Sequence, residues 1–244
     1  MRLDISEVVP NFPAFRVAVL VAKDIEVPVE RSASLAGFIA DCERATRERW
    51  RGMELSEIPG VAAWRRAYRA FGIKRTSYRS SVERLVKNVL AGASLPTVNG
   101  FVDAYNAISL RHVLPSGADD LDLICGDLAF RYSRPGDDFR DMGVLDDVGV
   151  PLADPPKEGE VVYADREKVL CRRWNWRQDA RSAIRGSTKR AVVTLQQNGV
   201  GDAAAAAEEL AALLRDECGA RSSITMLDLR APVSELGSRD RRLG

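Results

Sequence analysis

Two hydrophobic patterns divide the chain into a helical half and a strand-rich half. Between residues 34 and 112, apolar positions recur every three or four residues, the spacing of helices that bury one face. This spacing predicts helices over residues 34–51, 61–71, 80–91 and 97–112. Before them, the apolar and β-branched run 15–21 predicts a buried strand.

After His112 the pattern changes to the alternation that is typical of strands. Residues 126–133 alternate as a half-buried strand does, and 160–164 with 169–174 predict a hairpin. Residues 114–117 predict a turn before a β region that begins at Leu121, and the proline-rich segment 146–159 predicts a loop. Two more strands and an alanine-rich helix complete the pattern, at 191–196, 223–229 and 203–215.

This order of elements predicts an α+β fold with a largely antiparallel sheet. We expect one domain over residues 1–237 and a flexible tail over 238–244, because no linker or repeat interrupts the pattern.

The segment 94–112 carries polar residues among the apolar positions of a predicted helix. Pro96 keeps Leu95 out of helical geometry, so we expect Thr97 to cap the helix. Asn99, Asp103 and Asn106 follow within the apolar stripe. Buried polar groups need partners, so these side chains either tie the helix to neighbouring strands or face a pocket.

A second unusual segment, CRRWNWRQ, occupies residues 171–178. If the strand continues through it, Trp174 and Trp176 share one face while Asn175 and Arg177 share the other. The tryptophans either close the edge of the core or form, with the arginines, a platform for a base or an aromatic ligand. Thr188, after a short basic loop, either offers a hydroxyl to a ligand or caps a turn.

Charge is segregated along the chain, although the net charge is only +1. Between residues 65 and 87 there are eight Lys or Arg and one acid, Glu83. This imbalance indicates a polyanion partner, although two solvated helix faces would give a similar pattern. The residues that we expect to contact RNA are Arg65, Arg66, Arg69, Lys74, Arg75 and Arg79.

Composition excludes several other classes of protein. No apolar run approaches the roughly 20 residues of a membrane helix, and the first ten residues carry acids, so we expect a cytoplasmic protein without a membrane partner. Four scattered cysteines and one histidine make a metal site unexpected, and we expect no cofactor. Glycine-loop, nucleophile-elbow and zinc-binding catalytic motifs are absent.

Five motifs, in this order, resemble the stand-alone B3/B4 domain proteins, which are similar to the editing domain of the phenylalanyl-tRNA synthetase beta subunit. They are LPTVN at 95–99, VDAYN at 102–106, GDL at 126–128, GEVVY at 159–163 and RWNWR at 173–177. The resemblance covers roughly residues 59–196. It implies a B3/B4-like fold with a cleft between two halves, and hydrolysis of the ester of a mischarged aminoacyl-tRNA. The chain shows no ATP-binding motif, so we do not expect it to charge a tRNA.

The first hypothesis is therefore a trans-acting editing enzyme, an aminoacyl-tRNA deacylase whose partner is tRNA rather than DNA. Asn106, Asn175 and Glu160 are its expected catalytic residues. Its expected substrate-binding residues are Asn99, Asp103, Trp174, Trp176, Arg177 and Thr188. The second hypothesis is a non-catalytic module that binds a tRNA end or a free amino acid. A purely structural domain leaves the clustered asparagines and tryptophans without a reason.

Overall fold

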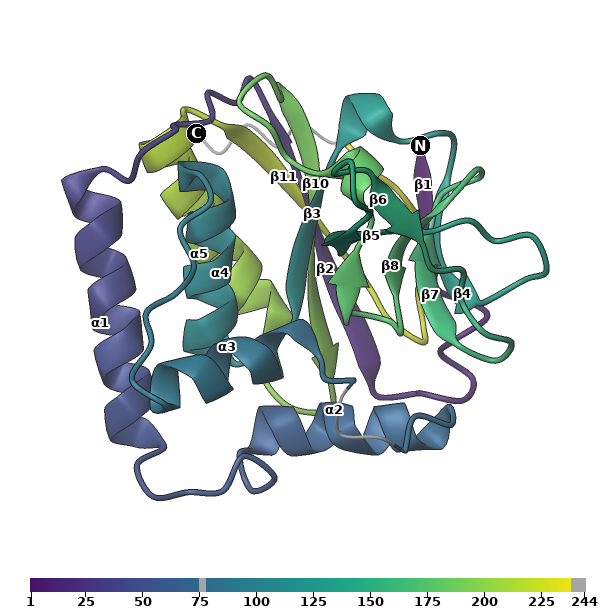
Figure 1. Ribbon diagram of the computed structural model, residues 1–244, viewed down its shortest axis with the longest axis horizontal. Helices are drawn as coiled ribbons and strands as arrows, with labels where there is room; N and C mark the ends of the chain where they lie inside the picture. Colours follow the sequence, from purple (N-terminus) through teal and green to yellow (C-terminus); the bar gives the residue numbers. More distant parts are fainter. Residues whose placement is uncertain (75–77, 238–244) are drawn as a thin grey trace.

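The computed structural model describes residues 1–74 and 78–237 and has an α+β fold, as the sequence predicts (Figure 1). The helices of these residues are α1 (Ala33–Arg49), α2 (Pro59–Ala70), α3 (Ser81–Leu90), α4 (Gly100–His112) and α5 (Ala203–Cys218), with short 3₁₀ turns at Leu121–Leu123 and Ala180–Ser182. None of these helices is long and apolar enough to cross a membrane.

Two sheets form the strand part of the molecule. The first has the order β11 (Arg221–Leu227), β2 (Phe15–Lys23), β10 (Arg190–Asn198), β3 (Ser116–Asp120), and all its pairs are antiparallel. The second has the order β12 (Val233–Glu235), β1 (Arg2–Asp4), β4 (Leu128–Tyr132), β7 (Val161–Ala164), β8 (Val169–Arg172), β9 (Arg177–Gln178). Its β1–β4 pair is parallel. A small ribbon pairs β5 (Arg140–Leu145) with β6 (Pro151–Ala153).

The first sheet is the middle layer of the fold. Figure 1 shows α1, α3, α4 and α5 on one side of it and β4, β7 and β8 on the other. Strand β2 is accordingly buried on both faces, with Ala18 and Leu20 in the core under the helices and Val17 and Val19 in the core between the sheets. A continuous apolar strand is the pattern that two-sided burial requires.

Strand β10 has the same alternation but becomes polar at one end. Val193 and Leu195 face the helices, whereas Val192 packs between the sheets. Thr194 and Gln196 follow on that second face, where they are buried polar residues. The gap between the sheets therefore changes from apolar core to polar wall along one strand.

Several local predictions are wrong in instructive ways. Helix α4 is capped by Asn99 rather than by Thr97, because the Asn99 side chain accepts a hydrogen bond from Val102 N at 3.0 Å. The predicted turn at 114–117 runs into strand β3, and the region after Leu121 is a 3₁₀ turn. The predicted loop 146–159 contains β6, which pairs back onto β5.

The segment between β8 and β9 is a turn, not the continued strand that alternation predicts. Arg173 and Trp174 have positive φ angles of 47° and 67°, and Trp176 N donates to Arg172 O at 3.0 Å. Positive φ costs free energy in residues other than glycine. The Trp174 indole offsets this cost: it is fully buried, and its ring centroid lies 4.9 Å from that of Phe15 and 5.2 Å from that of Trp64.

Replacing Trp174 with alanine is expected to lower the free energy of unfolding by about 3–5 kcal/mol, because it empties the centre of an aromatic cluster. Trp176→Ala is the matched control, since that ring is only half-buried and lines a cavity. Urea denaturation of both variants measures the difference. Equal losses would contradict the assignment of Trp174 to the core and Trp176 to the cavity.

Candidate functional site

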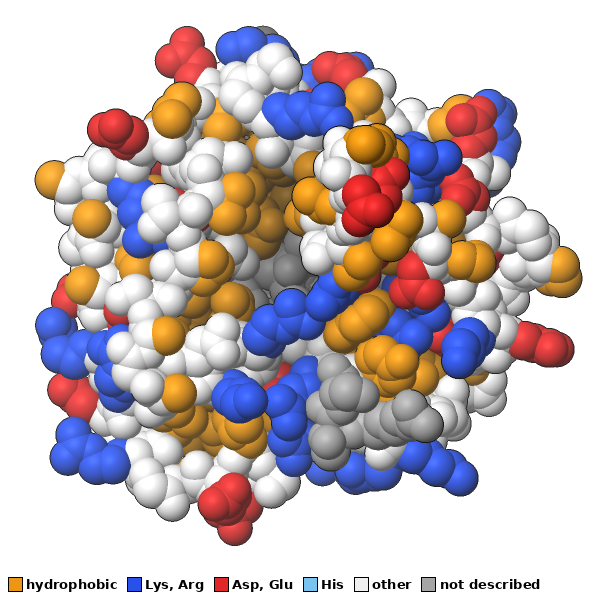
Figure 2. All heavy atoms as spheres, in the orientation of Figure 1, with side chains coloured by type: hydrophobic (Ala, Val, Ile, Leu, Met, Phe, Trp, Pro, Cys, Tyr) orange, Lys and Arg blue, Asp and Glu red, His pale blue; other side chains and the backbone are white. Residues whose placement is uncertain are grey.

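A cavity of about 370 Å³ opens between the two sheets on the helical side of the molecule. Residues of α3, α4, β3, β5, β7, β8, β9 and β10 form its walls, together with the turn at Asn175 and Trp176. Figure 2 shows a hollow on this face, between the helical side and the strand-rich side. Its size is that of a small-molecule pocket.

Five side-chain atoms of the cavity wall are buried and lack a hydrogen-bond partner within the described residues. They are Ser81 Oγ, Ser116 Oγ, Tyr163 OH, Trp176 Nε1 and Arg177 Nε. Most buried polar atoms in folded proteins have a partner, and each one left without costs about 1–3 kcal/mol. Their concentration around one cavity is typical of a site that binds a polar ligand.

Tyr163 supplies the most deeply buried of these groups, from strand β7. Burial raises the pKa of its phenol well above the ordinary value, so the hydroxyl stays protonated and can donate a hydrogen bond.

Asn175 connects three elements at the cavity wall. Its Oδ1 accepts from Tyr68 OH of α2 at 2.9 Å, and its Nδ2 donates to Gln196 Oε1 of β10 at 3.0 Å. Its backbone oxygen accepts from Ser81 N, at the start of α3, at 2.8 Å. The amide lines the cavity, as the sequence hypothesis requires, but its polar atoms already have partners within the protein.

Asn106 differs from Asn175 in this respect. It lies half-buried on α4 and lines the cavity, and its amide makes no hydrogen bond to the part of the chain that the structure describes. A half-buried amide without a protein partner is available to a ligand.

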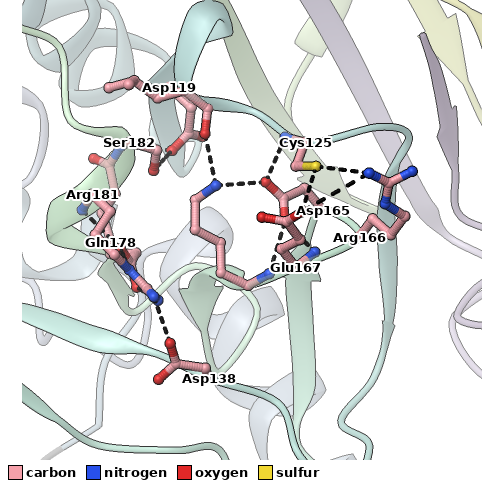
Figure 3. Close-up of polar contacts among 12 residues, drawn as sticks. Asp119, Cys125, Asp138, Asp165, Arg166, Glu167, Gln178, Arg181 and Ser182 are labelled. Carbon is pink, nitrogen blue, oxygen red and sulfur yellow. Dashed lines mark hydrogen bonds and ion pairs between the residues drawn. The ribbon is translucent and has the colours of Figure 1, made fainter.

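An acidic group lies at the wall formed by β3. Asp119 is buried and accepts a hydrogen bond from Ser182 Oγ at 2.6 Å (Figure 3). It accepts another from Gln178 Nε2 at 2.9 Å. Burial raises the pKa of Asp119 to about 7, although these two hydrogen bonds act in the opposite direction. The cavity therefore contains a carboxyl group that exchanges its proton near neutral pH.

Two arginines line the cavity. Arg177 pairs with Asp141 of β5 at 2.9 Å. Arg84 of α3 is exposed at the cavity and forms no ion pair with any described residue. Arg84 is thus the cation best placed to meet an anionic group of a ligand.

Glu160, an expected catalytic residue, does not line the cavity. Its carboxylate is buried and held by Arg172 Nη2 at 2.8 Å and Arg173 Nη2 at 3.4 Å. The Arg173 guanidinium lies in turn over the rings of Tyr78 and Trp176. Glu160 is therefore the counter-charge of two buried arginines outside the cavity wall.

Four expected substrate-binding residues also lie outside the cavity wall. Asn99 caps α4, and Asp103 is buried against Arg31 at 2.7 Å. Thr188 donates to Asp120 Oδ2 at 2.6 Å, and Trp174 belongs to the aromatic core. Each of these side chains makes its main contacts within the protein, away from the cavity. Trp176 and Arg177 are the expected binding residues that the fold brings to the cavity.

The predicted basic surface is only partly free of internal partners. Arg65 and Arg79 both pair with Glu83, at 2.6 and 2.9 Å. The exposed cations without an ion pair among the described residues are Arg66, Arg69 and Lys74. Arg75 lies outside the described residues.

Sequence reasoning missed Asp119, Tyr163 and the start of α3 as parts of the site. One pattern in the sequence indicated a polar wall. Thr194 and Gln196 alternate within an apolar strand, which places two polar side chains on one buried face. Among the described residues, no group of three His, Cys, Asp or Glu could hold a metal ion.

A family model described as the B3/4 domain matches residues 63–219. Because this match covers well over half of the 244 residues, the chain belongs to the B3/4 domain family. The family that the five motifs indicate is thereby confirmed.

The comparison with curated proteins gives no match. Among solved structures, the chain is similar to an N-terminal fragment of the phenylalanyl-tRNA synthetase beta-subunit from Pyrococcus horikoshii, with a TM-score of 0.46 and 10% sequence identity. That alignment covers 90% of this chain and 49% of the other, so the chain spans about half the length of the fragment.

The raised pKa of Asp119 predicts a pH dependence of stability. Between about pH 4 and pH 7 the folded state keeps a proton on Asp119 that the unfolded chain has released. Unfolding then releases a proton, so this group makes the protein less stable as the pH rises through that interval. Asp119→Asn removes the effect, and its unfolding free energy is expected to fall less than that of the parent protein from pH 4.5 to 7.5.

Denaturant unfolding across this pH range tests the prediction. Asp122→Asn is the matched control, because Asp122 is an exposed aspartate three residues further along the chain. Parallel curves for the parent and Asp119→Asn would show that Asp119 titrates alike in the folded and unfolded states, against the prediction.

Proposed function

We propose that this protein hydrolyses the ester bond of mischarged aminoacyl-tRNAs in trans. The observation that carries the proposal is the cavity, in which five buried polar atoms have no partner among the described residues. Beside it lie cations with no ion pair to that part of the chain. Membership of the B3/4 family and the motif resemblance to synthetase editing domains support the same activity.

The chemistry requires little from the protein, because an aminoacyl ester is already reactive. In the proposed reaction, Asp119 accepts a proton from water as the water oxygen attacks the ester carbonyl. A group with a pKa of about 7 suits this role at neutral pH. The bond to the ribose oxygen then breaks, and that oxygen takes the proton back from Asp119.

Hydrogen-bond donors around the cavity stabilise the negative charge that develops on the carbonyl oxygen. Asn106 and Trp176 donate from α4 and from the turn after β8, and Tyr163 donates from β7. Donors that the fold already holds in position are effective at this task. The apolar part of the wall, including Leu85 and Leu170, accommodates the amino-acid side chain.

A second candidate function is binding of a free amino acid without hydrolysis. Arg84, which has no ion-pair partner among the described residues, favours it, since a free amino acid carries a carboxylate that an ester lacks. Calorimetry with the free amino acids distinguishes the two: tight binding without turnover of any mischarged tRNA supports the second function.

Asn106→Ala is expected to slow deacylation by about a hundredfold, because it removes a donor to the developing oxyanion. The stability of the variant should be close to that of the parent, since its amide makes no hydrogen bond to a described residue. Asn88→Ala, an exposed asparagine on α3 outside the cavity, is the matched control. The assay is single-turnover hydrolysis of tRNAs charged with each non-cognate amino acid.

Two outcomes of this assay contradict the proposal. One is the absence of turnover by the parent protein with every mischarged tRNA. The other is a loss of about 1–3 kcal/mol of stability in Asn106→Ala with unchanged turnover, which would make Asn106 a buried structural tie.

The joint replacement of Arg66, Arg69 and Lys74 with alanine is expected to weaken tRNA binding and to flatten its salt dependence. If each cation contacts one phosphate, the slope of log K against log salt should decrease in magnitude by about 2–3. The matched control replaces Arg44, Arg49 and Arg51, exposed arginines at the far end of α1 and just beyond it. An unchanged slope in the first variant would place the RNA contacts elsewhere.

A further inference from the structure

A second, smaller recess lies between α2 and the start of α3. Its volume is about 90 Å³. The residues that matter for its chemistry are Arg65, Arg69, Lys74, Arg79, Ser80 and Glu83. None of them lines the cavity described above.

Ser80 has an unusual role at this recess. It is the N-cap residue of α3, yet its side chain accepts no hydrogen bond from the helix, as a capping serine ordinarily does. Only 2% of Ser80 is exposed, its Oγ has no hydrogen-bond partner among the described residues, and the residue lines the recess. A buried hydroxyl that is not used within the protein points to an acceptor on a ligand.

The recess is strongly positive. Glu83 is shared by Arg65 and Arg79, so these three side chains carry one positive charge in total. Arg69 and Lys74 are exposed at the recess and have no ion pair with a described residue. The N-terminus of the ten-residue helix α3 adds a partial positive charge.

The recess adjoins the cavity through neighbouring residues. Ser80 lines the recess, while the next residue, Ser81, lines the cavity. Tyr68 lines the recess, and its hydroxyl donates to Asn175 in the cavity wall. The recess and the cavity are therefore neighbours, on either side of the start of α3.

We propose that the recess between α2 and α3 is a binding site for one phosphate group, with Ser80 as hydrogen-bond donor and Arg69 and Lys74 as charge partners. The phosphate belongs to the RNA strand whose end enters the cavity. A tetrahedral anion with several acceptor oxygens fits one hydroxyl and several cations. The RNA source rests on the proposed function, whereas the phosphate chemistry does not.

The test measures the affinity of the protein for an RNA trinucleotide ending in adenosine. Ser80→Ala and Lys74→Ala are each expected to weaken binding about tenfold, since each removes a contact to a charged oxygen. Lys87→Ala, an exposed lysine on α3 outside the recess, is the matched control and should bind as the parent does. Thermal melts should show little change in Ser80→Ala, because its side chain caps nothing.

A chemical change in the RNA makes the test specific for one phosphate. In a trinucleotide with an uncharged methylphosphonate at the last linkage, the parent protein should bind about tenfold more weakly. Ser80→Ala should then lose nothing further, because the partner of Ser80 is already altered. Additive losses would overturn the proposal.

Two further measurements, of inorganic phosphate binding and of hydrolysis, distinguish RNA from free phosphate as the ligand. They also distinguish failure of the phosphate site from failure of the proposed hydrolysis. Suppose that inorganic phosphate binds the parent protein and that Ser80→Ala no longer binds it but keeps the parent's affinity for the RNA trinucleotide. The assignment of the phosphate to RNA is then wrong. If the parent hydrolyses no mischarged tRNA but the methylphosphonate result holds, the phosphate site stands and the proposed hydrolysis fails. If hydrolysis occurs and Ser80→Ala binds RNA normally, the phosphate site is wrong.

Discussion

The burial of one indole ring controls the geometry of the site. Trp174 occupies the centre of the aromatic core between the sheets, and the chain reaches that position only by taking positive φ angles at two successive residues. The resulting turn directs Asn175 and Trp176 to the cavity and returns the chain as β9, which carries Arg177. Free energy from apolar burial thus holds a strained segment in place, a frequent arrangement beside functional sites.

The cavity exists because the middle sheet packs against other elements on both of its faces. Its strand β10 supplies apolar side chains to the helical layer and, on its other face, changes from Val192 to Thr194 and Gln196. The second sheet faces that polar end with Tyr163 and Gln178. Where apolar packing between the sheets stops, polar side chains line the cavity, and their burial strengthens the hydrogen bonds that they offer to a ligand.

The start of α3 serves two neighbouring sites with successive residues. Ser80 and Ser81 differ by about 100° around the helix axis, so the two hydroxyls face different spaces. Glu83, one turn further, pairs with Arg65 and Arg79, so that Arg66, Arg69 and Lys74 have no ion pair among the described residues. The distribution of partners, rather than the number of basic residues, decides which part of this surface can attract an anion.

The sequence by itself determined the α+β class, the five helices to within a few residues and most strands of the two sheets, because burial periodicity is a local property of the chain. Its motifs also indicated the family, and of the asparagines and tryptophans that it singled out, Asn106, Asn175 and Trp176 line the cavity. Only the tertiary structure decided which polar residues reach the cavity. Glu160, Asp103 and Thr188 lie elsewhere because distant partners bind them, and Asp119 enters because β3 pairs with β10. Such partners are separated by many residues along the chain, so no local pattern reveals them.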